Sequence, residues 1–439
     1  MAPLDPTPPA IDWDDVLAEI TSILREYIRI NTSNPPGNEE AAARFLGDIL
    51  AREGYDCEYV DAEPGRTQLR TRLAGTGSKQ PLMLLNHTDV VPAQPEFWDV
   101  DPFEGVIKDG YIWGRGALDM KGMGVLELMV MLLFKRHQIM PSRDLIFLAV
   151  ADEETGSSMG IEWLDDHHQD WLSEPEFAIN EGGMGMLNFL GANRPVFAAA
   201  PAEKGPLWLR LRATGRPGHG SVPHADNAVD KLARALVAIQ GWERATTVQP
   251  MMQAVVDELQ AANAWSGLRP TPEELAEQHP AFLAALSNTI SATSLGGGIK
   301  HNVIPAFSEA TLDCRLLPGE SHDDFITELR NVIDDGDIEV ESVMQSESGF
   351  SDFNTELVGV MSEVVREQVE GAVLVPLTTV GFTDSRVLRR RGVQSYGFVP
   401  TLMDSVLAAG IHGHNERVPI ESLRTGIQIL FEVVRRFTA

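Results

Sequence analysis

Cysteines, long apolar runs and positive charges are scarce in this sequence, and each shortage excludes a class of protein. Only Cys57 and Cys314 occur among 439 residues, so a disulfide framework is excluded and a reducing cytoplasm is the expected compartment. The longest apolar run, ELMVMLLF at 127–134, is far shorter than the roughly 20 residues that cross a membrane. The N-terminal MAPLDPTPPAIDWDD lacks the basic and apolar segments of a secretory signal, so none is expected.

Acidic residues greatly outnumber basic ones. The 64 Asp and Glu against 35 Lys and Arg give a formal charge of −29. Such a surface repels nucleic acid and anionic membranes, so neither is an expected partner. The hydrophobic fraction of 43% and the charged fraction of 23% are ordinary for a globular protein. Because 439 residues are too many for one core of usual size, two or three domains are expected.

Apolar segments in the first part of the chain alternate between two periodicities. Helical spacing predicts helices at 13–29, 39–54 and 123–137, and short apolar runs predict strands at 81–86, 143–152 and 175–180. Strands that are apolar throughout and alternate with helices favour a mostly parallel sheet with helices on both faces. We therefore predict an α/β domain.

The pattern changes from about residue 204. The stretches KGPLWLRLRATG and FSEATLDCRLLP alternate apolar and polar residues, as strands do when one face of their sheet meets solvent. Each precedes a predicted helix, whereas 248–282 has no clear assignment. The helical and apolar-strand pattern resumes near residue 351. The sequence thus predicts a small α+β domain at 204–345, inserted into a discontinuous domain formed by 1–203 and 346–439.

Each apolar strand of the larger domain ends in a group that can bind a cation. His87 follows the first strand, Glu153 and Glu154 follow the second, and Glu181 follows the third. The carboxyl ends of parallel strands meet at one edge of a sheet, so these side chains are expected to converge. Asp89, two residues after His87, is either an ordinary polar residue of a turn or a hydrogen-bonding partner of that histidine.

Two further residues complete a set of candidate ligands. Asp119 lies in the glycine-punctuated WGRGALDMKG, and His412 lies in AGIHGHNERV. Taken singly, Asp119 is equally a helix cap and His412 an ordinary polar group. Adjacent carboxylates at the end of a buried strand, however, disfavour ionisation unless a cation neutralises them. Two imidazoles with three carboxylates form the ligand set of a two-metal hydrolase, most suited to Zn²⁺, with Mn²⁺ or Co²⁺ able to substitute.

A series of short motifs resembles that of a known family. NHTDVVP, GRGALDMKG, DEETG, NEGG, GRPGHGS, HNVIP, DCR, TDSR and HGHNE follow one another along the chain. They are similar to the motifs of the co-catalytic zinc hydrolases that include aminoacylase-1, glutamate carboxypeptidase, succinyl-diaminopimelate desuccinylase and acetylornithine deacetylase. GRGALDMKG with DEE downstream is the most specific part. The resemblance implies a two-metal hydrolase domain with an inserted lid and dimerisation domain.

The resemblance also implies roles for the candidate ligands. His87 and Glu181 would bind one metal ion, Glu154 and His412 the other, and Asp119 would bridge the two. In this family the peptide bond after the bridging aspartate is usually cis. Asp89 would hold the His87 imidazole in orientation.

Catalytic roles follow from the same resemblance. Glu153 resembles the general base, which takes a proton from water and passes it to the leaving amine. His219 of GRPGHGS resembles a histidine of the inserted domain that donates to the developing oxyanion, commonly from the partner subunit. A homodimer formed through the inserted domain is therefore expected.

Substrate contacts are assigned in the same way. Asn302 of HNVIP and Arg315 of DCR resemble a substrate-binding pair, and Thr383, Asp384 and Arg386 of GFTDSR are expected to shape the pocket floor. A guanidinium forks onto a carboxylate, so Arg315 suits a substrate with a free terminal carboxylate, unless it is an ordinary strand arginine. Phe382 departs from the family, many members of which have glycine there, and would either narrow the pocket or line it for an apolar side chain.

The function expected from these observations is hydrolysis of an amide or peptide bond in a small substrate with a free carboxylate. Candidates are an N-acyl amino acid, a dipeptide or the C-terminal residue of a peptide, so the enzyme would be a zinc metallopeptidase or amidohydrolase of carboxypeptidase or aminoacylase type. Two alternatives are a catalytically inactive member that acts as a binding protein and a dimer in which metals only stabilise the fold. An inactive member would be expected to lack part of the catalytic set, which is complete in this sequence. Structural zinc sites are usually closed by four protein ligands, so the additional Glu153 argues against the purely structural dimer.

Overall fold

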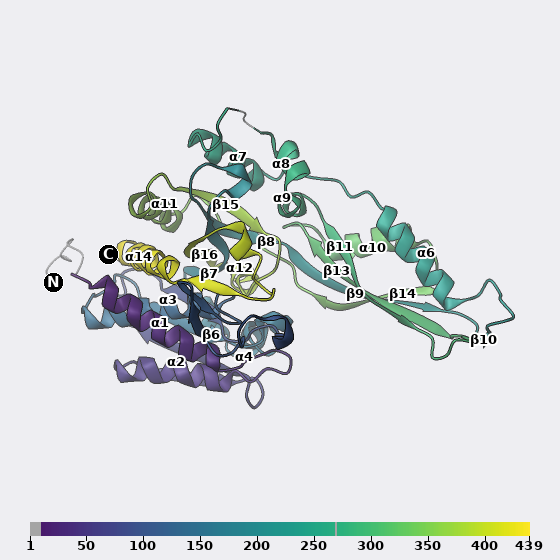
Figure 1. Ribbon diagram of the computed structural model, residues 1–439, viewed down its shortest axis with the longest axis horizontal. Coiled ribbons are helices and arrows are strands. Elements are labelled where there is room, and N and C mark those ends of the chain that lie inside the picture. The colour runs from purple at the N-terminus through teal and green to yellow at the C-terminus, as the bar shows by residue number, and fades with distance from the viewer. Residues whose placement is uncertain (1–9, 268–269) are drawn as a thin grey trace.

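The computed structural model describes residues 10–267 and 270–439. Figure 1 shows a layered body and an elongated second part that extends from it. Within the described residues no helix combines the length and apolar character needed to cross a lipid bilayer.

The body is built on an eight-stranded sheet in the order β1-β2-β6-β3-β7-β16-β8-β15. These strands are β1 Cys57–Asp61, β2 Thr67–Leu73, β3 Leu82–His87, β6 Leu145–Val150, β7 Phe177–Met186, β8 Val196–Glu203, β15 Val373–Thr379 and β16 Gln394–Met403. The pairs β3–β6, β3–β7, β7–β16 and β8–β15 are parallel. The predicted strands at 81–86, 143–152 and 175–180 are confirmed as β3, β6 and the start of β7.

Helices cover both faces of this sheet, as predicted for an α/β domain. On one face lie α1 Trp13–Arg29, α2 Glu40–Arg52, α3 Lys121–Arg136, α11 Glu356–Gln368 and α14 Ile420–Phe437. On the other lie α4 Ile161–His167, α5 Gln169–Ser173 and α12 Ser385–Arg390. Alternate residues of β3 enter the two cores, Leu82 and Leu84 the first, Met83 and Leu85 the second. Because both faces are buried, the strand reads as a continuous apolar run.

The second part contains an antiparallel sheet in the order β11-β13-β9-β14. Its strands are β9 Gly205–Thr214, β11 Thr289–Gly297, β13 Phe307–Leu316 and β14 Ile338–Gln345. Helices α6 Ala228–Gly241 and α10 His322–Ile333 cover one face, where Leu207, Leu209 and Leu211 are buried. The intervening Trp208, Arg210 and Arg212 lie on the uncovered face, which explains the alternating sequence.

The stretch 248–282, unassigned from sequence, forms helices over the edge of the larger sheet. Helices α7 Pro250–Ala261, α8 Pro272–Gln278 and α9 Pro280–Ala285 share a core with strands β8 and β15. Three helices inside the span 204–345 therefore pack on the body, while the rest of that span forms the second domain. The sequence-based bounds 1–203, 204–345 and 346–439 stay a prediction.

A small three-stranded sheet and one short helix complete the body near the C-terminus. The sheet has the order β17-β5-β4, with β4 Val106–Lys108, β5 Tyr111–Trp113 and β17 Arg417–Pro419, and the helix is α13 Ser405–Ala408. At the far end of the second domain, β10 Gly218–His219 pairs with β12 Val303–Ile304 (Figure 1).

Candidate metal centre

The five candidate metal ligands come together at the carboxyl ends of the central strands. His87 Nε2, at the end of β3, lies 3.1 Å from Asp119 Oδ1 and 3.5 Å from Glu181 Oε1. His412 Nε2 lies 3.1 Å from Asp119 Oδ2 and 3.0 Å from Glu154 Oε2. Each imidazole thus faces one oxygen of Asp119 and one glutamate, the pairing that the family resemblance implies. The peptide bond between Asp119 and Met120 is cis, as that resemblance also led us to expect.

The electrostatics of this cluster favour a bound cation. Burial first, and then the charge of Glu181, raise the pKa of Glu153 well above its ordinary value. Burial and the neighbouring Asp119 raise the pKa of Glu181 to about 8, and the same two causes raise the pKa of Glu154. Such shifts mean that the negative charges repel one another in a poorly solvated place. Glu154 Oε1 is moreover buried and has no hydrogen-bond partner among the described residues. Divalent cations fit this set of imidazoles and carboxylates.

The two halves of the cluster differ in exposure. The His87 side chain is 1% exposed, whereas that of His412 is 52% exposed. His412 therefore faces solvent, whereas the Glu154 side chain beside it is only 4% exposed.

Asp89 holds the turn that carries two of the glutamates. The main-chain N–H groups of Glu153 and Glu154 donate to its carboxylate at 3.1 and 3.2 Å, and Asn34 Nδ2 donates at 2.9 Å. His87 Nδ1 lies 3.0 Å from the Asp89 carbonyl oxygen and 3.5 Å from the nearer carboxylate oxygen. Asp89 thus touches both the histidine and the turn, a second contact that the sequence did not suggest.

Thr383, Asp384 and Arg386 lie behind the same turn. Ser157 Oγ donates to Asp384 at 2.6 Å, and Arg386 donates to the Gly156 carbonyl oxygen at 3.0 Å. Thr383 Oγ1 donates to Glu203 at 2.6 Å. Burial raises the pKa of Asp384 to about 6. Asp384 and Arg386 thus support the turn from the protein side, whereas Thr383 bonds to β8. Contact of these three residues with substrate stays a prediction.

Arg315 lies where the two domains meet. Its Nε and Nη2 donate to Asp313 at 2.7 and 3.1 Å, while Nη1 is buried and has no partner among the described residues. The guanidinium carbons of Arg315 and Arg386 each lie 4.9 Å from the Phe382 ring centroid. Trp208 of β9 meets that ring edge-on at 6.2 Å. Phe382 therefore packs between the two domains.

His219 and Asn302 lie elsewhere. Both are exposed at the far end of the second domain, where Gly220 N donates to the Asn302 carbonyl oxygen at 2.8 Å. The label of β10 in Figure 1 marks this end, remote from the central sheet. Within one chain the structure brings Arg315, but neither His219 nor Asn302, to the junction of the domains.

The comparison with known families identifies the chain. Residues 83–436, most of the sequence, match the protein family described as "Peptidase family M20/M25/M40". The chain belongs to this family. It is thus an enzyme that hydrolyses amide or peptide bonds with the help of metal ions, and the inactive alternative has no support.

Relatives with curated names span almost the whole M20 chain. Aminoacylase-1 of Sus scrofa is 28% identical over 423 residues, 94% of each chain. The human N-fatty-acyl-amino acid synthase/hydrolase PM20D1 is 27% identical over 378 residues, 82% of this chain and 74% of the relative.

Solved structures share the fold. The di-peptidase Dug1p of Saccharomyces cerevisiae superposes with a TM-score of 0.76 at 17% identity and 97% coverage of both chains. A dinuclear metal-binding M20 peptidase of Bacillus subtilis gives a TM-score of 0.60 at 13% identity, covering 97% of this chain and 98% of that one.

Two residues that support the M20 centre were missed by sequence reasoning. Asn34 donates to both Asp89 and Asp152, at 2.9 Å each. Glu416 accepts hydrogen bonds from the loop that carries Asp119. Glu416 ends the motif HGHNE, so the motif itself pointed to it, whereas nothing local marks Asn34 among the polar residues before Pro35.

Proposed function

We propose that the chain hydrolyses the amide bond of a small substrate with a free carboxylate: an N-acyl amino acid, a dipeptide or the C-terminal residue of a short peptide. The main support for this proposal is the cluster in which Asp119 lies between the imidazoles of His87 and His412, with Glu153 beside the cluster. Ligand atoms of His87, Glu153 and Glu181 lie within 4.8 Å of one another. The names aminoacylase-1, N-fatty-acyl-amino acid synthase/hydrolase and di-peptidase among the relatives support this class of substrate.

The proposed centre holds two divalent ions, Zn²⁺ in our proposal, with Mn²⁺ or Co²⁺ able to replace it. The ligands are His87 and Glu181 for one ion, His412 and Glu154 for the other, and Asp119 for both. When bound, such ions polarise the substrate carbonyl and lower the pKa of the attacking water.

Glu153 moves the proton in the proposed reaction. It accepts a proton from water as the water oxygen bonds to the carbonyl carbon, and it donates this proton to the amine nitrogen as the carbon–nitrogen bond breaks. The products are a carboxylic acid and an amine. Burial, which raises the pKa of the Glu153 carboxyl, supports this role because it makes the carboxylate a stronger base.

Arg315 receives the substrate carboxylate in this proposal. Its Nη1 is buried and has no acceptor among the described residues, so a substrate carboxylate that reached it would supply the missing partner. Burial, followed by the positive charges of Arg315 and Arg244, lowers the pKa of the nearby Lys204 to about 7. This group of basic side chains makes a local anion-attracting region in a chain of net charge −29.

Replacing Arg315 by methionine is expected to raise KM for an N-acyl amino acid about 10–100-fold, with a smaller change in kcat. This factor corresponds to the binding free energy lost with a charge-assisted hydrogen bond. The matched control is Arg212→Met, on the same uncovered sheet face but paired with Glu309. Steady-state kinetics with the free acid and with its carboxamide test the role. An equal loss for both substrates would contradict it.

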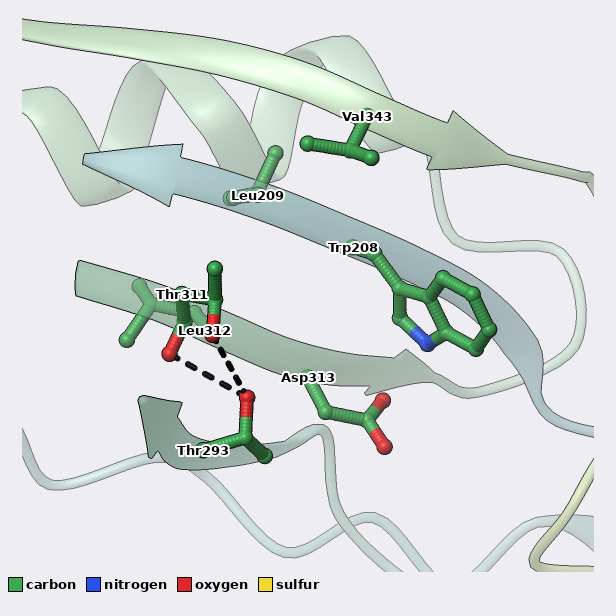
Figure 2. A pocket seen from close by; sticks show the side chains of 7 residues that line it. All are labelled: Trp208, Leu209, Thr293, Thr311, Leu312, Asp313 and Val343. Atoms are coloured by element: carbon green, nitrogen blue, oxygen red, sulfur yellow. Dashed lines mark hydrogen bonds between the residues drawn. The ribbon is translucent and has the colours of Figure 1, made fainter. Parts of the chain in front are cut away.

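A cavity of about 350 Å³ on the uncovered face of the second sheet is lined in part by Asp313, the residue to which Arg315 donates. Figure 2 shows Trp208 and Asp313 at one end of it and Val343 on the neighbouring strand. A substrate's carboxylate and side chain leave the same Cα atom. We therefore propose that the side chain of the carboxylate-bearing residue enters this cavity and that Trp208 favours an apolar one.

A hydrolysis screen tests the proposed function. N-acetyl amino acids, longer N-acyl amino acids and dipeptides are assayed across many amino acids, each with added zinc, manganese or cobalt. Release of the amino acid from carboxylate-bearing substrates is expected, with higher kcat/KM for apolar residues. Failure to cleave any of these substrates with every metal would refute the proposed substrate class.

We further propose a homodimer formed through the second domain, in which His219 and Asn302 serve the partner's metal centre. The exposed position of both residues at the far end of that domain, remote from the central sheet of their own chain, supports this arrangement. The free thiols Cys57 and Cys314 support a reducing cytoplasm as the compartment.

Mixing two inactive variants tests the role of His219 across the dimer. Glu153→Ala and His219→Ala are each expected to be nearly inactive, because one lacks the base and the other the oxyanion donor. After co-expression, half of the dimers are mixed and each has one intact site, so about a quarter of wild-type activity should return. No recovery in mixed dimers would show that His219 acts within its own chain.

A further inference from the structure

Glu416 is a fully buried carboxylate whose hydrogen bonds all end on the loop that carries Asp119. Its Oε2 accepts from Arg115 Nη1 at 2.7 Å and from the main-chain N–H of Gly116 at 3.1 Å. Its Oε1 accepts from the N–H groups of Leu118 at 2.7 Å and Asp119 at 3.2 Å. One side chain therefore fixes the backbone from which the Asp119 carboxylate projects.

The same glutamate belongs to the loop that carries His412. Arg115 Nη2 donates to the Gly413 carbonyl oxygen at 3.0 Å, and Gly114 N donates to the Glu416 carbonyl oxygen at 3.0 Å. Strand β17 begins at Arg417, directly after Glu416, and pairs with β5, which ends at Trp113, directly before Gly114. The two ligand-bearing loops are thus joined along their length, with the Arg115–Glu416 ion pair between them.

This connection matters because it directly links the two loops that carry these ligands. Asp119 Oδ2 and His412 Nε2 lie 3.1 Å apart but come from residues almost 300 positions apart in the chain. His87 is fixed by a central strand and is buried, whereas His412 is half-exposed on a loop. The distance between Asp119 and His412 therefore depends on the contact between their loops.

We propose that Glu416 is a positioning residue that sets the spacing of Asp119 and His412 and thereby the affinity for the cation that these two hold with Glu154. The inference rests on the proposed two-metal centre and gives Glu416 no contact with substrate. Carboxylates that orient metal ligands from behind typically account for about 10–100-fold in metal affinity. A carboxylate that only stabilised the fold would leave the affinity of the folded protein unchanged.

Substitution Glu416→Gln tests this role, because an amide NH₂ replaces an oxygen that accepts from two donors. The Kd of the more weakly bound ion is expected to rise about 10–100-fold in competition with a chromophoric chelator, measured with Zn²⁺ and no substrate. With Mn²⁺, the electron paramagnetic resonance spectrum should change from that of a coupled pair toward isolated ions. The matched control Glu432→Gln, which removes a carboxylate paired with Arg435 and Arg436 on α14, should bind both ions as the wild type does.

Three outcomes would overturn the inference. Folded Glu416→Gln protein with wild-type metal affinity and a lower metal-free Tm would make Glu416 purely structural. If that variant does not fold, Glu416→Asp keeps the charge but is too short to reach all four donors, and an unchanged Kd there is equally decisive. Wild-type protein that binds fewer than two ions would overturn the proposed centre together with this inference. A lack of hydrolysis alone counts against the proposed function and not against this role.

Discussion

Glu153→Ala protein is expected to keep its metal ions and to lose turnover by about 10²–10⁴-fold, the usual contribution of a general base. The reason is its position: Glu153, 5% exposed, lies beside His87 and Glu181, while each of those two has other contacts within the cluster. Removing it leaves the mutual contacts of the five proposed ligands, which do not involve Glu153: His87, Asp119, Glu154, Glu181 and His412. Metal content by atomic emission and kcat for the best substrate of the screen measure the two effects separately.

The matched control is Glu363→Ala, an exposed position on α11 far from the strand ends, which should change neither quantity. Loss of metal together with activity would make Glu153 a ligand and not the base. Unchanged kcat would remove it from the mechanism altogether.

Chelation is expected to reduce turnover at least about 10²-fold and also to lower Tm, because four acidic side chains then face one another without a cation. Added Zn²⁺, Mn²⁺ or Co²⁺ should restore activity. Chelation followed by kinetics and thermal melting distinguishes an enzyme, which loses turnover, from a scaffold, which loses mainly Tm. Full activity in protein shown to be metal-free would refute the two-metal mechanism.

Metal affinity is expected to increase with pH. Without a cation, hydrogen bonds with Asp119 and Glu154 raise the pKa of His412 to about 10. Burial and the charge of Asp119 raise the pKa of Glu181 to about 8. Ligands must be deprotonated to bind a metal, so protons are released on binding. Metal affinity should therefore increase from pH 6 to pH 8, and isothermal titration at two pH values measures it.

The convergence of His87, Glu154 and Glu181 could be predicted from sequence because it depends on a general property of parallel sheets. Each of these residues lies in or just after an apolar strand, and the carboxyl ends of parallel strands share an edge. Asp119 and His412 lie on loops, whose paths are not set by strand periodicity, and only the motif resemblance placed them. The periodicity of the apolar residues by itself predicted the α/β body and the inserted α+β domain.

Other features could not be predicted, for physical reasons. Apolar residues in 248–282 indicate that this stretch packs on another part of the protein, but they do not identify that part. The packing of α7 on β15 therefore could not be predicted from the sequence. Asn34 and Glu416 act through contacts with residues 55 and about 300 positions away. A polar residue has no periodic signal, and its partners appear only when the chain is folded.

The packing of α7, α8 and α9 decides how the enzyme can be shortened. Cutting out the whole of 204–345 would leave Val196, Ala198, Val373 and Val375 without their apolar cover and would bare the last strand of the central sheet. An uncovered apolar edge strand is a template for aggregation. A minimal metal-binding body would therefore have to retain these three helices and delete only the far sheet with its two helices, and it would lose Arg315 and His219 with them.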